Sequence, residues 1–473
     1  MTSGIPNPEL DVLVVGGGIA GLAAAYQLQR LGRRVRVLEA SGRLGGVIRT
    51  ERFDGWTIDG GPDALLVQKP AAVALCRELG IADRLIPTLE PRTAYVMRDR
   101  RLHPIAPGSF LGFPLSAAAL ARSSLFTWAG RLRMACEVAI PRGGPGGEDE
   151  SIASFVRRRF GSEAADYLAE PLLAGIHAGD AERLSMRALF PRLLEAERRS
   201  GSVIRSMRAL RLRPSPQGAF VSLPGGVGEL VEALAAALEP GSAVCSARVT
   251  GLRRGGAAYA VESDAGRFDA RAVMLAIPAY AAARLLRSLD TALAALCDGI
   301  PYASTATVAF GYRRDQIGHP MRGSGFVVPR LEDSPLLAAT WVSSKWPGRA
   351  PEGCALLRAF LGGGRDPRGL DRTDDDLTAS ARESLEEVLD ITGPPLVTRL
   401  FRWPLQSPQY DVGHLERVAA IDERLTATPG LFLTGSGFRA IGIPDCIADG
   451  RATAAGADAY LAAAARQAPS PWA

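Results

Sequence analysis

The chain has 473 residues, of which 47% are hydrophobic and 22% charged, a composition typical of a globular protein with two or three domains. The formal net charge of +5 is mild, and no basic block is interleaved with aromatic residues, which argues against nucleic-acid binding. Six scattered cysteines without CxxC spacing predict free thiols in a reducing compartment, and four dispersed histidines predict no metal site.

The N-terminus carries no signal-peptide pattern, and no uncharged apolar run reaches the length of a membrane span. A cytoplasmic protein is therefore expected. The mild positive charge remains compatible with a peripheral contact to anionic lipid at the inner face of a membrane.

The segment from Val12 to Gly21, VLVVGGGIAG, is the most informative local pattern. Its apolar run predicts a buried strand, and the glycines predict a tight turn followed by a helix. In this pattern Gly16 permits the turn, Gly18 lets the backbone approach a pyrophosphate, and Gly21 lets helix and strand pack closely. The next strand ends at Glu39, the spacing of an acid that binds a ribose hydroxyl. The sequence therefore predicts a dinucleotide site.

A second glycine pair indicates which dinucleotide the site binds. Arg43-Leu-Gly45-Gly46 resembles the RxGG segment of flavin-containing amine oxidases and their relatives, in which the Arg reaches the pyrophosphate. Gly60-Gly61-Pro62-Asp63, at the end of the strand 56–59, predicts a rigid turn against a flat ring. A plain surface turn is the alternative for each segment alone. Together the segments favour FAD.

The last helix is predicted to begin at Gly442-Ile-Pro444-Asp445, because proline suits the first helical turn. Its positive end would face the flavin. Trp403 is a candidate wall for the ring and Val249 a candidate contact for the adenine, although an ordinary core role is equally open for both. The predicted FAD-binding residues are Gly16, Gly17, Gly18, Ile19, Ala20, Gly21, Glu39, Ala40, Arg43, Gly45, Gly46, Gly61, Pro62, Asp63, Ala64, Val249, Trp403, Gly435, Gly442, Ile443 and Pro444.

The periodicities predict a mixed α/β fold in which the two ends of the chain rejoin one domain. The Rossmann-like FAD-binding domain is predicted from residues 1–62, 220–290 and 403–465. Residues 63–110 and 291–402 are predicted to form a substrate-binding domain with an antiparallel sheet. Residues 111–219 are predicted to form an inserted helical domain, with one basic helix carrying Arg198, Arg199, Arg205, Arg208 and Arg211.

Four further segments resemble the oxygen-dependent porphyrinogen oxidases of haem synthesis: residues 170–180, 402–404, 408–414 and 442–447. The resemblance runs in order from Val12 to about Leu461. It implies a p-hydroxybenzoate-hydroxylase-like FAD domain, and a porphyrinogen that loses six hydrogens while oxygen becomes peroxide. It also implies a link to haem synthesis, with ferrochelatase as a candidate partner.

The choice of porphyrinogen rests on other segments. Residues 102–105, 340–347 and 350–353, and Lys69, resemble the branch that uses coproporphyrinogen III, which has four carboxylates. Protoporphyrinogen-using members tend to carry an arginine beside Tyr95, where this chain has Ala94. The coproporphyrinogen branch is therefore favoured, and protoporphyrinogen IX is the alternative substrate.

Three residues are predicted to serve the reaction itself. Gly175 is a candidate for backbone contact with pyrrole N–H groups, and His177 for lining the cavity or moving a proton. Lys69 is a candidate partner of a substrate carboxylate or an aid to proton transfer, with Lys345 and Arg92 as weaker carboxylate candidates. Each has a plain structural alternative.

Three other functions stay open. A flavin amine oxidase on the same fold is the main rival. A non-enzymatic carrier without flavin is disfavoured by the intact RxGG segment, and a carotenoid desaturase by the segments that resemble porphyrinogen oxidases.

Overall fold

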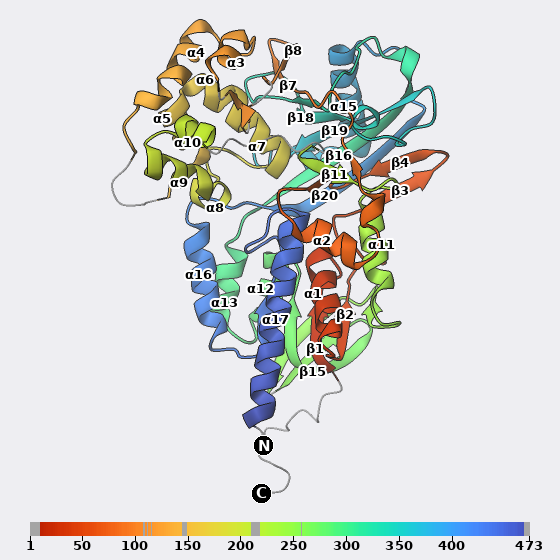
Figure 1. Cartoon of the computed structure of the whole chain (residues 1–473). Coiled ribbons are helices and arrows are strands. Elements are labelled where there is room, and N and C mark those ends of the chain that lie inside the picture. The colour runs from red at the N-terminus through yellow and green to blue at the C-terminus, as the bar shows by residue number, and fades with distance from the viewer. Residues whose placement is uncertain are drawn as a thin grey trace, which may run out of the picture.

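The computed structural model describes residues 10–106, 109–110, 112–114, 116–143, 149–209, 218–256 and 258–467. Figure 1 shows a lower half that contains both ends of the described chain, and an upper half with a second sheet and a group of helices. Helices and strands are mixed along the described chain, so the mixed α/β fold predicted from the sequence is confirmed.

The lower sheet has the strand order β12-β2-β1-β15-β14-β13, with β21 also paired to β15. Pairing is parallel between β12, β2, β1, β15 and β21, and antiparallel through β14 and β13. The strands are β1 (Leu10–Val15), β2 (Val35–Leu38), β12 (Ala243–Val244), β13 (Val249–Gly255), β14 (Ala258–Ser263), β15 (Gly266–Leu275) and β21 (Leu431–Leu433). Residues 245–248 turn beside the end of β2 and separate β12 from β13.

Helices cover both faces of this sheet, because its buried strands are apolar on both sides. In β1, Val12 and Val14 face one core and Leu13 and Val15 the other. The first core is covered by α1 (Ile19–Arg30), α2 (Ala71–Glu78), α11 (Gly228–Ala236) and α17 (Ile443–Gln467). The second is covered by α12 (Ala279–Leu286), α13 (Thr291–Asp298) and α16 (His414–Leu425).

The upper sheet has the order β20-β16-β19-β18-β17-β7-β8. Its strands are β7 (Ala94–Arg98), β8 (Arg101–Pro104), β16 (Tyr302–Arg313), β17 (Gly325–Val327), β18 (Leu336–Trp341), β19 (Cys354–Gly362) and β20 (Val397–Pro408). The predicted antiparallel sheet is found except at one pair, β17 and β7, which run parallel. The predicted domain boundary at residue 403 falls inside β20, so Trp403 belongs to this sheet.

Short strands and helices complete the upper half and the links to the lower one. They are β3 (Thr50–Phe53), β4 (Trp56–Asp59), β5 (Leu65–Leu66), β6 (Ile86–Pro87), β9 (Ser109–Phe110), β10 (Phe113–Pro114), β11 (Phe220–Ser222), α14 (Val342–Lys345), α15 (Asp374–Leu389) and 3-10 turns at 82–84, 314–316 and 369–371. The apolar side of α15 packs on the upper sheet through Leu377, Ala381 and Leu385.

The helical region predicted from the sequence contains short helices rather than long ones. They are α3 (Ala117–Arg122), α4 (Trp128–Ala135), α5 (Ile152–Phe160), α6 (Ser162–Ala164), α7 (Glu170–His177), α8 (Met186–Leu189), α9 (Pro191–Ser200), α10 (Val203–Ala209), a 3-10 turn at 136–139 and a π-helical turn at 165–169. The prediction of one basic helix is wrong. Gly201, with φ +71°, ends α9 before α10 starts, and Arg211 lies outside the described residues.

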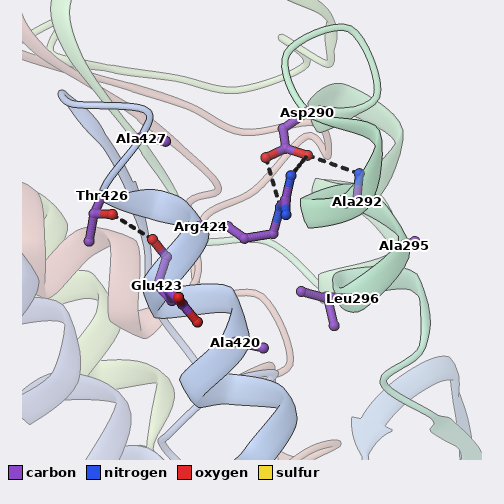
Figure 2. A pocket seen from close by; sticks show the side chains of 9 residues that line it. All are labelled: Asp290, Ala292, Ala295, Leu296, Ala420, Glu423, Arg424, Thr426 and Ala427. Carbon is purple, nitrogen blue, oxygen red and sulfur yellow. Dashed lines mark hydrogen bonds and ion pairs between the residues drawn. The ribbon is translucent and has the colours of Figure 1, made fainter.

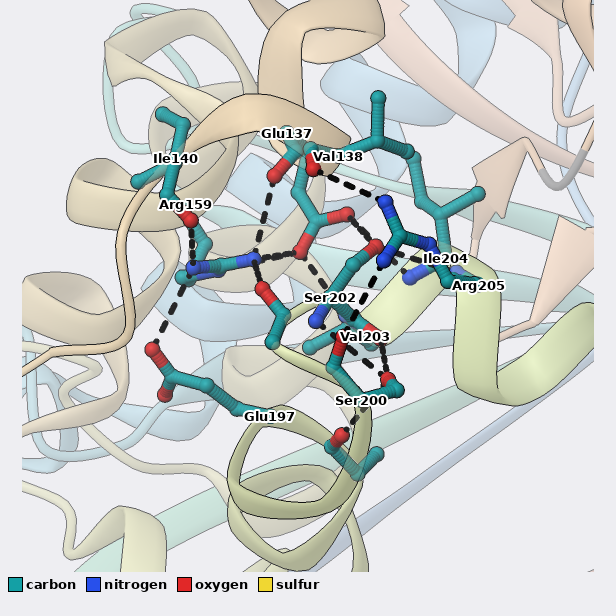
Figure 3. A network of polar contacts seen from close by, with 12 residues as sticks. Glu137, Val138, Ile140, Arg159, Glu197, Ser200, Ser202, Val203, Ile204 and Arg205 are labelled. Atoms are coloured by element: carbon teal, nitrogen blue, oxygen red, sulfur yellow. Dashed lines mark hydrogen bonds and ion pairs between the residues drawn. The ribbon is translucent and has the colours of Figure 1, made fainter.

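A buried ion pair holds these helices together (Figure 3). Arg159 and Glu137 are both fully buried, and Nε of Arg159 donates to Glu137 Oε1 at 3.0 Å. Glu137 also accepts the hydroxyl of Ser202 and the backbone N–H of Val203, at the start of α10. Arg159 donates in turn to the Gly201 carbonyl at 2.8 Å. One pair of charges therefore joins α5 to the junction of α9 and α10.

Candidate active site

The glycines of the turn between β1 and α1 are required for different reasons. Gly16 has φ +109°, and a Cβ there would lie 2.4 Å from the Ala276 carbonyl oxygen. A Cβ on Gly21 would lie 2.0 Å from the Gly16 carbonyl oxygen, so the fold itself requires both glycines. A Cβ on Gly18 would meet no atom within 4 Å. Open space therefore lies where the sequence predicts the pyrophosphate.

The first turn of α1 lies beside that open space and offers backbone donors to it. Ile19 and Ala20 begin the helix, and Gly18, which precedes them, supplies no side-chain cap. The first N–H groups of an uncapped helix lack partners within the helix and attract an anion. The observed geometry fits the phosphates of a dinucleotide.

Glu39 stands at the end of β2, next to the glycine turn. Its Oε2 accepts the backbone N–H of Gly17 at 2.7 Å, which holds the carboxylate at the turn. Ala40, which follows it, is exposed. The N–H of Ala247 donates to the Glu39 carbonyl at 2.8 Å, which brings the start of β13 and Val249 close to this acid. The predicted ribose and adenine contacts are therefore neighbours.

The RxGG segment folds onto the same turn. The N–H of Gly45 donates to the Gly17 carbonyl at 2.8 Å, and a Cβ on Gly46 would lie 3.2 Å from the Gly18 Cα. The guanidinium of Arg43 donates to three carbonyls of its own loop, among them that of Gly46. In this structure Arg43 thus shapes the loop rather than extending into solvent.

The Gly60–Asp63 turn packs tightly against this loop. A Cβ on Gly61 would lie 1.9 Å from the Val47 carbonyl oxygen, so only glycine fits. The indole Nε1 of Trp403 donates to the Gly60 carbonyl at 3.0 Å, so this ring lies beside the turn. Pro62 and Ala64 continue the turn and are partly buried.

Asp63 is buried within a ring of donors. Lys345 Nζ lies 3.0 Å from it, the Trp346 indole donates at 3.2 Å, and Arg358 Nη2 lies at 3.4 Å. Despite the opposing cost of burial, these cations hold the pKa of Asp63 well below its usual range. The suggestion that Lys345 binds a substrate carboxylate finds no support here, because Lys345 is already matched by Asp63.

The start of α17 approaches the start of α1 (Figure 1). Gly442 has φ +93° and precedes α17 (Ile443–Gln467), with Pro444 in the first turn as predicted. A Cβ on Gly435 would lie 3.6 Å from the Cβ of Ala20. The segments that the sequence assigns to FAD therefore meet at one edge of the lower sheet, although they come from both ends of the chain.

Lys69 lies beside the start of α17 and acts electrostatically on His177. Lys69 Nζ forms an ion pair with Asp445 Oδ2 at 2.5 Å, and the lysine side chain is 49% exposed. His177 ends α7, and its Nδ1 is buried without a hydrogen-bond partner within the protein. Burial, and next the charge of Lys69, lower the pKa of His177 to about 4. The imidazole is therefore neutral at physiological pH.

We expect the thermal stability to fall as the pH falls from 6.5 toward 4, because His177 resists the proton when folded. In that window the unfolded chain binds more protons than the folded one, so acid favours unfolding. The test is the melting temperature of the wild type, His177→Gln and, as a control, His103→Gln between pH 7 and 4.5.

His177→Gln should lose part of this dependence and the control none. Burial also lowers the pKa of His319 and His414, so a residual slope remains in the variant. An unaltered slope in His177→Gln would refute the neutral state of this imidazole.

Gly175 is closely packed in this structure. It lies within α7, and a Cβ there would point at Val327 and Ala338 of the upper sheet, at 3.3 and 3.6 Å. A methyl group would therefore press on the sheet first. The close packing of α7 on β17 and β18 is itself a reason for glycine at this position.

Sequence reasoning missed several residues of the site. Asp445 was seen only as part of the helix start, and Arg349 and Arg358 were not singled out. Arg358 interrupts the apolar run CALLRAFLG of β19, which was an available signal for a buried, partnered charge. Lys69 and Lys345, the only lysines of the chain, both lie at the predicted flavin segments.

A separate pocket of about 710 Å³ opens between α13 and α16 (Figure 2). Four alanines are among its lining residues, and an Asp290–Arg424 ion pair at 2.9 Å also lines it. These helices cover the sheet face opposite α1 and α17, so this pocket is separate from the glycine turn. Among the described residues, no group of histidines, cysteines and carboxylates is placed to hold a metal ion.

The fold and the glycine segments are those of a dinucleotide-binding oxidoreductase. The flavin containing amine oxidoreductase family matches residues 19–457. A coproporphyrinogen III oxidase of Bacillus subtilis is 36% identical over 95% of this chain and 98% of its own length. A coproporphyrinogen III oxidase of Mycobacterium tuberculosis is 35% identical, over 96% and 98%.

Solved structures agree. A structure from Exiguobacterium sp. 255-15, described as a protoporphyrinogen oxidase, superposes with a TM-score of 0.86 at 30% identity, covering 95% of this chain and 98% of that one. Cyclohexylamine oxidase from Brevibacterium oxydans shares the fold, with a TM-score of 0.72 at 17% identity over 96% and 100%. The chain therefore belongs to the flavin containing amine oxidoreductases, in the family of the coproporphyrinogen III oxidases.

Proposed function

We propose that this enzyme oxidises coproporphyrinogen III to coproporphyrin III, with FAD as its cofactor and molecular oxygen as the final acceptor. The observation that supports it best is the half-exposed Lys69, which pairs with Asp445 in the first turn of α17 and lies close enough to His177 for its charge to act on that imidazole, in a chain of this family. Six hydrogens leave the substrate as three hydrides and three protons, and three oxygen molecules become three hydrogen peroxides.

FAD fits the glycine segments on three counts: the open space at Gly18, the uncapped start of α1 and the carboxylate of Glu39 at the turn. When bound, it supplies the hydride acceptor, which no side chain provides. The proposed holding residues are those predicted from the sequence, with the Gly60–Asp63 turn and Trp403 against the ring.

The side chains near His177 orient the substrate. The half-exposed ammonium of Lys69 is available to a propionate, while Asp445 keeps it in place. The neutral imidazole of His177 lines this region, and its unpartnered Nδ1 is free to form a hydrogen bond with the substrate. Gly175 lies two residues before His177 on α7, and its proposed role remains a backbone contact with the pyrrole N–H groups.

The test compares porphyrin fluorescence formed from coproporphyrinogen III and from protoporphyrinogen IX by the FAD-loaded protein in air. We expect a higher kcat/KM for coproporphyrinogen III, since it offers four carboxylates. Lys69→Met should raise KM about tenfold, the effect of losing one charged hydrogen bond of about 1.5 kcal/mol.

Lys69→Arg should stay near wild type, and Arg253→Met, an exposed cation on β13, serves as the control. Preference for protoporphyrinogen IX would support the alternative substrate. No product from either, with flavin bound, would favour an amine oxidase.

For the location of the protein we propose the cytoplasm, with a peripheral contact to anionic lipid. Within the described part of the chain, no helix is long and apolar enough to cross a membrane. Trp128 and Leu132 on α4 are 77% and 68% exposed, and Arg131 stacks on Trp128. Residues 116–135 contain arginines and no acidic residue, which suits anionic headgroups.

Wild-type protein should sediment with phosphatidylglycerol vesicles and not with phosphatidylcholine vesicles. Replacing Trp128 and Leu132 by serine should weaken sedimentation at least about tenfold, because each buried apolar side chain contributes about 1.5 kcal/mol or more. Leu331→Ser, at a position 63% exposed, is the matched control. Wild type that stays in the supernatant would refute the contact. Ferrochelatase is the proposed partner protein, and its co-sedimentation with the enzyme in the same assay tests that contact.

A further inference from the structure

The carbonyl groups of three consecutive residues, Asp59, Gly60 and Gly61, all accept hydrogen bonds from side chains of the upper sheet. Arg358 on β19 donates to the Asp59 carbonyl and, at 2.7 Å, to that of Gly61. The Gly60 carbonyl accepts the hydroxyl of Thr307 on β16 at 2.6 Å, besides the Trp403 indole. Three neighbouring strands therefore fix the backbone of one turn.

Arg358 makes the largest contribution to this arrangement. It is 4% exposed, and its guanidinium also lies over the ring of Phe360, 4.7 Å from the centroid. It reaches the carboxylate of Asp63 at 3.4 Å, so it contacts the turn at both ends. A planar guanidinium offers several donors in fixed directions, which an ammonium group cannot match.

The charges behind the turn do not balance. Lys345, Arg349 and Arg358 form ion pairs with two carboxylates, those of Asp59 and Asp63. All five side chains are buried or nearly so, where charges are weakly screened. A third carboxylate that acts on Arg349, that of Glu229, is itself paired with Arg84. An excess of positive charge next to a redox group favours its taking up electrons.

We propose that Arg358 is a positioning residue for the flavin: it holds the Gly60–Asp63 turn against the ring and places a fixed positive charge behind it. This inference rests on the proposed function only in taking that turn as the flavin contact. The upper sheet, which the sequence assigns to the substrate-binding domain, thereby acts on the cofactor.

The experiment compares Arg358→Met, Arg358→Lys and the control Arg402→Met. Arg402 lies on β20 of the same sheet, but donates to the carbonyls of Leu370 and Arg372, away from the turn. For each protein we would measure the Kd for FAD by titrating the apoprotein, the midpoint potential of the bound flavin, and the thermal stability of the apoprotein.

Arg358→Met should bind FAD at least tenfold more weakly and have a more negative flavin potential. Arg358→Lys should keep the flavin potential near the wild-type value, because the positive charge remains. It should still bind FAD more weakly, because two carbonyls of the turn lose their donor. Arg402→Met should change the Kd less than about twofold, because Arg402 does not contact the turn. Its ion pair with the exposed carboxylate of Asp374 is worth little.

An Arg358→Met protein with wild-type Kd and potential would overturn the proposal, as would one altered only in apoprotein stability. If Arg358→Met does not fold, Arg358→Lys decides by the same two quantities. A wild type that binds FAD but does not oxidise coproporphyrinogen III would refute the proposed function and leave this test intact.

Discussion

A Gly18→Val variant is expected to fold as the wild type does and to bind FAD about a hundredfold more weakly. Gly18 has φ −71° and ψ 173°, which valine adopts without strain, and a Cβ there meets no protein atom within 4 Å. The added side chain would occupy the space that the pyrophosphate needs. Losing two charged hydrogen bonds of about 1.5 kcal/mol each corresponds to about a hundredfold in affinity.

The measurements are the Kd for FAD and the melting temperature of the apoprotein. Gly21→Val is the contrasting variant, because its Cβ would lie 2.0 Å from a backbone oxygen and should destabilise the apoprotein itself. A Gly18→Val protein that retains wild-type flavin affinity would show that the dinucleotide does not approach this turn.

Arg159→Met should destabilise the helical region by about 3–5 kcal/mol, because it leaves the carboxylate of Glu137 buried without its cation. Figure 3 shows why the loss spreads: Arg159 also donates to carbonyls at the ends of two other segments, among them Gly201. The change should appear as a lower urea midpoint and as faster proteolysis within residues 116–209.

Two further variants test whether the loss of stability comes from the buried, unpaired charge. Adding Glu137→Gln to Arg159→Met should recover part of the loss, since the unpaired charge is removed. Arg199→Met, which breaks an exposed pair with Glu195, should cost less than about 0.5 kcal/mol. Equal urea midpoints for Arg159→Met and Arg199→Met would contradict a stabilising role for the buried pair.

The sequence alone predicted the dinucleotide half well, for a local reason. The strand β1, the glycine turn and the helix α1 follow one another directly, and each glycine's role depends on its near neighbours. The alternation of Val12, Leu13, Val14 and Val15 between two cores likewise follows from the period of a strand. Where prediction failed, as at the helix break of Gly201, a single glycine outweighed the basic pattern around it.

The sequence by itself determined the fold class, the glycine segments and the family, because these depend on short patterns and their order along the chain. Only the tertiary structure decided that Lys69 meets Asp445, 376 positions away, and that Arg358 holds the turn at Asp59, 299 positions away. Such pairs leave no local periodicity. They arise because strands and helices from distant segments converge at one edge of the sheet, where burial requires every charge to find a partner.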